Sequence, residues 1–217
     1  ANNKSLTKMH AATRLCLLSI LFGVLTACST APPVPEHLRQ AYWQEHQTVL
    51  TALPDWTVNG SISAETREDD WSARVNWKHG PDKYKLRIYG PLGQNSAVLR
   101  GNANGVTLRD TDGRSYAASD PQTLMRDHFA IDLPVTSLRY WIRGLPAPDF
   151  PIITSSLNNQ GRLAKLIQAD WRLTYQSYRR YNNRLLPRRI RLENSEYQIE
   201  IVISKWLFSA TQNAKPT

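Results

Sequence analysis

Apolar and polar side chains alternate one by one over long stretches of this 217-residue chain, and no other feature constrains its fold more. Between residues 56 and 64, the even positions hold Trp, Val, Gly, Ile and Ala, and the odd positions hold Thr, Asn and Ser. Residues 71–78 and 84–89 repeat this period of two. Successive side chains of a strand point to opposite faces of its sheet. The alternation therefore predicts antiparallel strands that bury one face and expose the other.

Strand patterns lie on both sides of a short helical interruption. The predicted strands are residues 56–64, 71–78, 84–89, 97–100, 106–109, 163–168, 171–176, 189–193 and 197–203. Between them, Ser119-Asp120-Pro121 is typical of a helix start, with an N-cap and a proline in the first turn. A second short helix is expected to open near Pro134 and to stop at Gly144. Its apolar side carries Leu138, Trp141, Ile142 and Leu145, and Arg139 and Arg143 are expected off that side.

A further helix is expected at residues 36–50, where Leu38, Tyr42, Glu45 and Val49 fall near one face and predict modest amphipathicity. A sheet of many antiparallel strands has an apolar face that another layer must cover. The helices available for this cover are short. We therefore expect a mainly β protein with some α structure, an unclosed antiparallel β half-barrel covered by a short helical lid, with room for a gap between them.

The N-terminal stretch has the order of an export signal. Basic or polar residues precede an apolar run at residues 15–25, and Thr26-Ala27-Cys28 follows. This order predicts a secretory signal peptide, and the cysteine after the cut resembles the lipobox of bacterial lipoproteins. We expect residues 1–27 to be removed and Cys28 to carry lipid. The alternatives are a chance cysteine after an ordinary signal, or an uncut anchor, although a spanning helix needs about 20 apolar residues.

The remaining chain is expected to form one domain. Residues 28–35 are interpreted as the lipidated N-terminus and a proline-rich linker, residues 36–208 as the folded body, and residues 209–217 as a polar tail. Cys16 lies in the discarded signal and Cys28 would be lipidated, so no disulfide framework is possible in the mature chain.

Charge narrows the classes of partner. Residues 1–28 hold three basic residues and no acid, so the mature chain has 27 − 3 = 24 basic and 18 acidic residues, a net charge of +6. An exported protein does not routinely meet nucleic acid, so we expect no nucleic-acid partner. Anionic lipid head groups are the expected counter-charge, and an incidentally basic surface is the alternative.

Signals for catalysis are poor. The histidines are scattered, and neither an H-E-x-x-H zinc motif nor a G-x-S-x-G nucleophile elbow occurs. We therefore expect no enzyme, no catalytic residue, no metal site and no cofactor.

Four motifs spread along the chain form a recognisable set. They are the lipobox at Cys28, the strand start Trp56-x-Val58-x-Gly60, the turn Tyr89-Gly90-Pro91-Leu92-Gly93, and the run SLRYWIRGLP at residues 137–146. Together they resemble the LolB family of outer-membrane lipoprotein receptors. The resemblance implies a lidded, unclosed β-barrel that takes lipoproteins from the periplasmic carrier LolA and inserts them into the outer membrane, without nucleotide or metal.

The same resemblance implies a lipid-anchored protein on the periplasmic face of the outer membrane. Its expected partners are LolA, the acyl chains of client lipoproteins and outer-membrane lipids, and we expect a monomer. Two alternatives of other classes stay open: an envelope module of the same fold that binds lipid or senses lipoproteins without transfer, and a passive scaffold lipoprotein.

Leu92 is the position that matches the family's membrane-insertion leucine. Gly90-Pro91-Leu92-Gly93 fits a type I turn with Pro91 second and Gly93 fourth, which places Leu92 at the loop tip. We expect Pro91, Leu92 and Gly93 to form an insertion loop, and the alternative is that Leu92 folds back into the core. Gly90 stands where the family is expected to have asparagine.

The apolar side of the second short helix has two interpretations. Leu138, Trp141, Ile142 and Leu145 could be ordinary core residues, as apolar stripes at helical spacing usually are. Under the resemblance, they form the lid of an apolar cavity that holds the acyl chains of a client.

Overall fold

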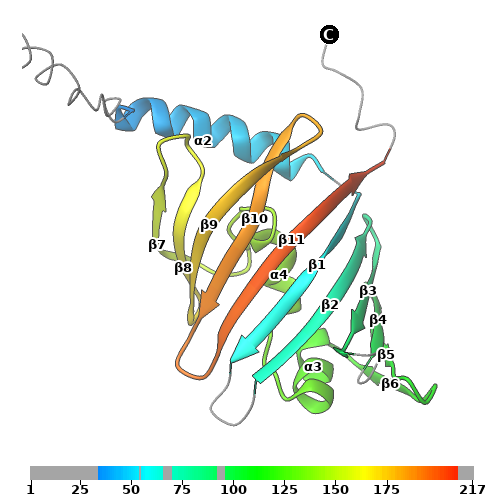
Figure 1. Ribbon diagram of the computed structural model, residues 1–217. Coiled ribbons are helices and arrows are strands. Elements are labelled where there is room, and N and C mark those ends of the chain that lie inside the picture. Colours follow the sequence, from blue (N-terminus) through cyan, green and yellow to red (C-terminus); the bar gives the residue numbers. More distant parts are fainter. Residues whose placement is uncertain (1–33, 54, 66–69, 92–95, 210–217) are drawn as a thin grey trace, which may run out of the picture. The chain divides into compact units, whose positions relative to one another are not determined.

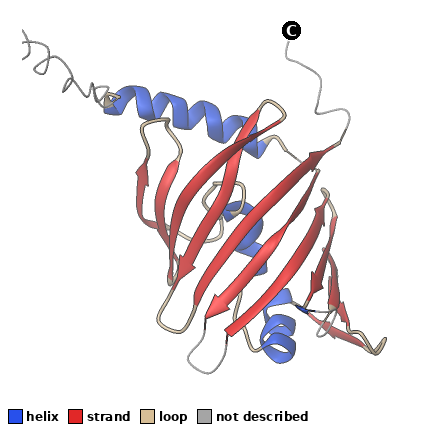
Figure 2. Ribbon diagram, in the orientation of Figure 1, coloured by secondary structure: helices blue, strands red, loops and turns tan. Residues whose placement is uncertain are grey.

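The structure is a computed structural model that describes residues 34–53, 55–65, 70–91 and 96–209. The chain divides into two compact units, Ala1–Pro33 and Val34–Thr217, and the second unit is the folded body. Within the described residues of this body, three helices accompany one eleven-stranded sheet (Figures 1 and 2). The helices are α2 (Glu36–Thr51), α3 (Pro121–Phe129) and α4 (Val135–Trp141).

The sheet is antiparallel throughout and does not close. Its strands are β1 (Trp56–Glu65), β2 (Asp70–His79), β3 (Lys83–Tyr89), β4 (Ala97–Asn102), β5 (Gly105–Arg109), β6 (Ser115–Ala118), β7 (Ile152–Leu157), β8 (Leu163–Gln168), β9 (Trp171–Tyr181), β10 (Arg184–Glu193) and β11 (Gln198–Phe208). Their order is β6-β5-β4-β3-β2-β1-β11-β10-β9-β8-β7, so the first and last strands pair at the centre. The predicted fold class, an unclosed antiparallel half-barrel with helices, is confirmed.

The lid helices occupy the connection between the two edges of the sheet. β6 and β7 are the edge strands, and α3 and α4 lie between them in the chain. The chain therefore crosses from one edge to the other over one face of the sheet, and Figure 2 shows α4 behind the central strands and α3 beside the lower ends of β1 and β2. The buried side chains of β1, Trp56, Val58, Ile62 and Ala64, have the predicted period of two and belong to the single apolar core.

Both edge strands were missed by the sequence pattern. β6 alternates only between exposed and partly buried residues, and nearly all of β7 is exposed, including Ile152 and Ile153. Each is held by backbone pairing with one neighbour, β5 or β8. Because an edge strand can pair without burying an alternating face, hydrophobic periodicity does not reveal it.

The start of α3 and the stop after α4 lie where the sequence predicts them. The Asp120 carboxylate accepts a hydrogen bond from Thr123 N (2.9 Å), and Pro121 is the first residue of α3. This bond lowers the pKa of Asp120, because it stabilises the charged form. After α4, Gly144 adopts a left-handed backbone (φ +79°), which terminates the helical turn as expected for glycine.

Helix α2 departs from the amphipathic prediction. An amphipathic helix ordinarily buries its apolar face, yet Leu38, Tyr42 and Val49 remain 39%, 47% and 45% exposed. A neighbouring face packs inward instead, through partly buried Trp43 and fully buried Leu50. The turn between β7 and β8 packs directly against α2, where a Cβ at Gly161 would overlap Tyr42 Cβ and the Arg39 carbonyl.

Candidate functional site

A narrow apolar cavity, which we call the seam, lies between the sheet and the lid helices. All its lining residues are apolar or aromatic, apart from one glycine where β1 is bulged. They are Val58, Gly60 and Ile62 of β1, Trp71, Val75 and Trp77 of β2, Leu86 and Ile88 of β3, Ile201 and Ile203 of β11, and Met125, Leu133, Leu138 and Ile142 of the lid. The seam is therefore an interior that alkyl chains, and not polar ligands, would enter.

The seam is too small to hold an acyl chain as it stands. Its volume is about 40 Å³, close to the ~30 Å³ that one molecule occupies in liquid water and well below the ~150 Å³ of a cavity that binds benzene. The expected gap between lid and sheet is thus nearly filled by side chains. An acyl chain could enter only if α3 and α4 moved away from the sheet.

The four predicted lid residues divide into two groups. Leu138 and Ile142 line the seam, whereas Trp141 and Leu145 are buried outside it. Trp141 is completely buried, and its carbonyl accepts a hydrogen bond from the Tyr175 hydroxyl (3.1 Å). Trp141 and Leu145 therefore hold the end of the lid, and acyl binding by any of the four stays a prediction.

Gln168 is a buried polar residue that fixes this end of the lid. Its Oε1 accepts hydrogen bonds from Trp141 Nε1 (2.9 Å) and Ala147 N (2.8 Å), and its Nε2 donates to the carbonyls of Ala147 and Phe150 (both 2.7 Å). Gln168 was not predicted as a site residue from the sequence. The sequence contains one indication of this role. Gln168 follows the buried Leu166 of β8 by two positions, so its side chain lies on the same inward face of the sheet.

Arg143 provides the second tie, and here the sequence-based expectation is wrong. Arg143 was expected off the apolar side of its helix, but it is 7% exposed. Its guanidinium donates to the carbonyls of Arg139 (3.0 Å) and Leu50 (3.1 Å) and lies over the Tyr140 ring. Burial lowers the pKa of Arg143 to about 10. The arginine goes inside because its guanidinium donates to the Leu50 carbonyl, one of the last in α2, and to the Arg139 carbonyl of α4.

The opposite end of the lid is held more loosely. The Phe129 ring of α3 makes an edge contact with Trp71 of the seam at 6.0 Å, and both residues are only partly buried. His128 is exposed and lies against Tyr116 at 4.1 Å. The Trp71–Phe129 contact is therefore a place where a residue that lines the seam is partly exposed to solvent.

The predicted anchor and most of the predicted insertion loop lie outside the described residues. This applies to Cys28, Leu92 and Gly93, and Pro91 alone is described and is exposed. The proposed boundaries of signal peptide, linker and tail also fall in or next to undescribed segments. Their roles stay predictions.

Two further properties of the described residues concern metal binding and membrane crossing. No three His, Cys, Asp or Glu side chains within the described ranges lie close enough to share a metal ion. None of the three described helices has the length and apolar content required to cross a membrane.

Comparison with known sequences gives one family. The family model described as Outer membrane lipoprotein LolB matches residues 54–206. The outer-membrane lipoprotein LolB of Nitrosococcus oceani is 35% identical over 195 residues, which cover 88% of this chain and 97% of that protein. The LolB protein of Pseudomonas fluorescens is 36% identical over 167 residues, which cover 77% and 81% of the two chains.

Comparison with solved structures agrees with the fold. A LolA-superfamily protein from Nitrosomonas europaea has a TM-score of 0.53 at 11% identity, covering 86% of this chain and 96% of that one. A DUF1329-family protein from Desulfovibrio piger has a TM-score of 0.52 at 9% identity, covering 82% and 94%. At such identities the likeness concerns the fold alone.

Proposed function

Because this chain belongs to the LolB family of outer-membrane lipoproteins, we propose that it accepts acylated lipoproteins from the periplasmic carrier LolA and inserts them into the outer membrane. The observation that carries this proposal is the wholly apolar seam between sheet and lid. Each methylene group buried there contributes about 0.8 kcal/mol. In each transfer step the acyl chains then move to a site that binds them more tightly, first from LolA to the seam and then from the seam to the bilayer. This transfer requires no catalytic step.

The contacts at the two ends of the lid favour opening at one end. Gln168 and Arg143 tie the end of α4 and the residues after it to the sheet and to α2 through five hydrogen bonds. The α3 end is held by buried Leu124 and Met125 and by ring contacts such as Trp71–Phe129. We propose that the lid pivots about the Gln168 end and that acyl chains enter beneath Phe129, next to Met125 and Leu138.

Membrane attachment is assigned to two further features. Acyl chains on Cys28 would hold the protein on the periplasmic face of the outer membrane, since stable anchoring needs more than one chain. Leu92 would insert only transiently, because burying one leucine is worth about 1.5–3 kcal/mol.

A cargo-transfer assay tests the proposal. A loaded LolA-type carrier is mixed with the protein, and the distribution of an acylated lipoprotein between them is followed, first without and then with liposomes. We expect cargo to move to this protein and then to the bilayer. Ile142→Phe, which fills the small seam, should slow acceptance several-fold, because the closed lid then packs more tightly.

The matched control is Ile153→Phe, which makes the same change at a site on β7 that is 64% exposed. It should transfer like the wild type. Wild-type protein that takes no cargo would contradict the receptor proposal. If such protein nevertheless retains lipid after purification, the alternative of a lipid-binding or lipoprotein-sensing module is favoured.

A further inference from the structure

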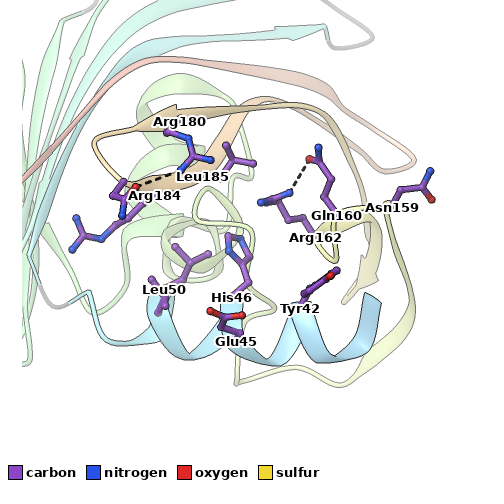
Figure 3. Close-up of a pocket in the computed structure, with 12 residues that line it drawn as sticks. Tyr42, Glu45, His46, Leu50, Asn159, Gln160, Arg162, Arg180, Arg184 and Leu185 are labelled. Carbon is purple, nitrogen blue, oxygen red and sulfur yellow. Dashed lines mark hydrogen bonds between the residues drawn. The ribbon is translucent and has the colours of Figure 1, made fainter. Parts of the chain in front are cut away.

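A second cavity, separate from the seam, lies between α2 and the tips of two hairpins (Figure 3). It has a volume of about 460 Å³, within the usual range of ~300–1,000 Å³ for small-ligand sites. Residues of α2 line one side, the β7–β8 turn a second, and the β9–β10 hairpin a third. None of its lining residues also lines the seam. We call it the α2 pocket.

The α2 pocket is strongly basic. Arg162, Arg180 and Arg184 line it, and Figure 3 shows Arg180 and Arg184 on the hairpin opposite α2. Arg162 Nη1 donates to Gln160 Oε1 (2.7 Å), and Arg180 Nη1 lies 3.5 Å from Asn183 Oδ1. These two arginines thus contact neutral amides and form no ion pair with a carboxylate among the described residues.

Two buried nitrogen atoms at the pocket have no hydrogen-bond partner in the described part of the chain. They are Arg162 Nε and His46 Nε2. Burial, and then the charge of Arg162, lower the pKa of His46 to about 4. Burial and the neighbouring charge of Arg180 also lower the pKa of Arg162, partly offset by Tyr178. The pocket therefore concentrates positive potential that an anion would relieve.

One carboxylate stands among these cations. Glu45 of α2 also lines the pocket and forms no ion pair with any described residue. A site with two or more guanidinium groups and a single carboxylate matches a zwitterion whose anionic part is a phosphate and whose cationic part is an amine. A free phosphate alone would leave Glu45 unused.

An exposed apolar stripe continues from the pocket along α2. Tyr42 and Val49 line the pocket, and Leu38 lies one turn before Tyr42 on the same face. This is the face that α2 leaves exposed to solvent. A phosphate site beside an exposed apolar stripe has the chemistry of the interface between lipid head groups and acyl chains.

The pocket walls are held rigidly. Asn158 Oδ1 accepts hydrogen bonds from Gln160 N (2.9 Å) and Arg162 N (3.1 Å), which fixes the β7–β8 turn. Gly161, with φ +65°, lets this turn approach α2 closely. The arginine of the turn and the residues of α2 are therefore presented in one fixed arrangement.

We propose that the α2 pocket binds the head group of a phospholipid that carries a phosphodiester and a primary amine, as in phosphatidylethanolamine. Arg162 and Arg180 bind the phosphate, Glu45 binds the ammonium group, and the lipid's apolar part lies along Tyr42 and Val49. The inference adds a second lipid site to the proposed function and uses none of the seam. The eight residue-to-residue steps from Cys28 to Glu36 span at most about 28 Å, which would keep α2 near the membrane if Cys28 carries the lipid anchor.

This site also has a geometric consequence. In Figure 1, α2 crosses one end of the sheet, and the end of β3 and the start of β4 lie toward the other end. Head-group binding at α2 and insertion by the β3–β4 connection are therefore two separate contacts of the body with the bilayer.

Binding is measured on the full chain in maltoside micelles free of phosphate. O-phosphoethanolamine is titrated while the His46 ring signals, assigned with His46→Gln, are followed by NMR. We expect saturable shifts and a rise in the pKa of His46, because the bound phosphate offsets the field of Arg162. Phosphocholine and inorganic phosphate should bind more weakly, since neither can donate an N–H bond to Glu45.

Matched variants locate the site. Arg162→Gln should weaken phosphoethanolamine binding about tenfold, because charge-assisted hydrogen bonds are the strong ones. Arg180→Gln, a more exposed change, should act in the same direction if Arg162→Gln folds poorly. Arg172→Gln, an exposed site on β9 outside the pocket, should leave binding unchanged. Glu45→Gln should remove the preference over phosphocholine.

Either of two results would overturn the inference: equal weakening by Arg172→Gln, or inorganic phosphate binding as tightly as phosphoethanolamine. A final arm uses vesicles of phosphatidylethanolamine with phosphatidylglycerol, compared with vesicles in which phosphatidylcholine replaces the ethanolamine lipid. The protein should bind the first more tightly, and Arg162→Gln should abolish the difference. Because no lipoprotein cargo is present, failure here leaves the transfer proposal untouched.

Discussion

Replacing Gln168 with leucine tests how firmly one end of the lid is held to the sheet. Leucine has nearly the same size, so the packing is kept while the hydrogen bonds are lost. Gln168 is completely buried and makes four of them, with Trp141, Ala147 and Phe150. In the variant, two N–H groups and two carbonyls lose their partner.

The magnitude follows from those four groups. The Phe150 carbonyl is only partly buried, so water can replace its partner. The other three are buried, and each costs about 1–3 kcal/mol when it is left without a hydrogen bond. Allowing for relaxation, we expect a loss of about 4 kcal/mol in the free energy of unfolding. This is a large fraction of the ~5–15 kcal/mol that stabilises a typical domain.

Urea unfolding followed by tryptophan fluorescence measures this loss. With a slope near ~2 kcal/mol per molar urea, the midpoint should fall by about 2 M at an unchanged slope. The control is Gln198→Leu, because the Gln198 amide donates one exposed hydrogen bond to Glu65 (3.1 Å). A loss below about 1 kcal/mol for Gln168→Leu, or an equal loss for both variants, would refute the role of Gln168 as the tie.

Three further predictions concern the membrane and pH. Leu92→Glu should leave cargo acceptance intact and slow release into liposomes at least about tenfold, since a charge near the bilayer centre costs roughly 2.5–3.5 kcal/mol. An equal loss of acceptance and release would contradict the insertion role of Leu92. Cys28→Ala should fold and accept cargo but not remain with the membrane fraction; circular dichroism of an unfolded chain would contradict this. The pKa of His46 in the folded state, about 4, lies below its ordinary value of 6.5, so the unfolded chain binds the proton first as the pH falls. The stability contributed by neutral His46 is complete above pH 6.5 and is lost toward pH 4. Between pH 7 and 5, the wild type should therefore lose on the order of 1 kcal/mol more unfolding free energy than His46→Gln, after discounting for the partial exposure of the side chain. Equal losses of the two proteins in urea unfolding would contradict this prediction.

Patterns among residues close together in the chain were enough to predict much of the sheet and of the lid. The side chains of β1 alternate as the sequence predicts, and Asp120 and Gly144 mark the start of α3 and the stop after α4. These features depend on neighbours within a few residues, through strand pleating, N-capping and the left-handed backbone of glycine. A helical lid over an antiparallel sheet follows from the order of such elements.

The candidate site was predicted only in part. Spacing placed Leu138 and Ile142 on the apolar side of the lid helix, and both line the seam. The same spacing could not separate them from Trp141, which lies outside the seam and hydrogen-bonds Gln168. Periodicity tells which side of a helix faces inward, but the position of the facing strands determines which of those residues borders a cavity.

Short-range sequence patterns were enough to predict the alternating strands, the capped helices and the apolar character of the interior. The volume of the seam, the burial of Arg143 and the exposed face of α2 follow instead from the packing of the folded chain. All three depend on contacts between residues far apart in the chain, such as Arg143 with Leu50 and Gly161 with Tyr42. Short-range patterns carry no information about such contacts, which form only when the sheet has brought those segments together.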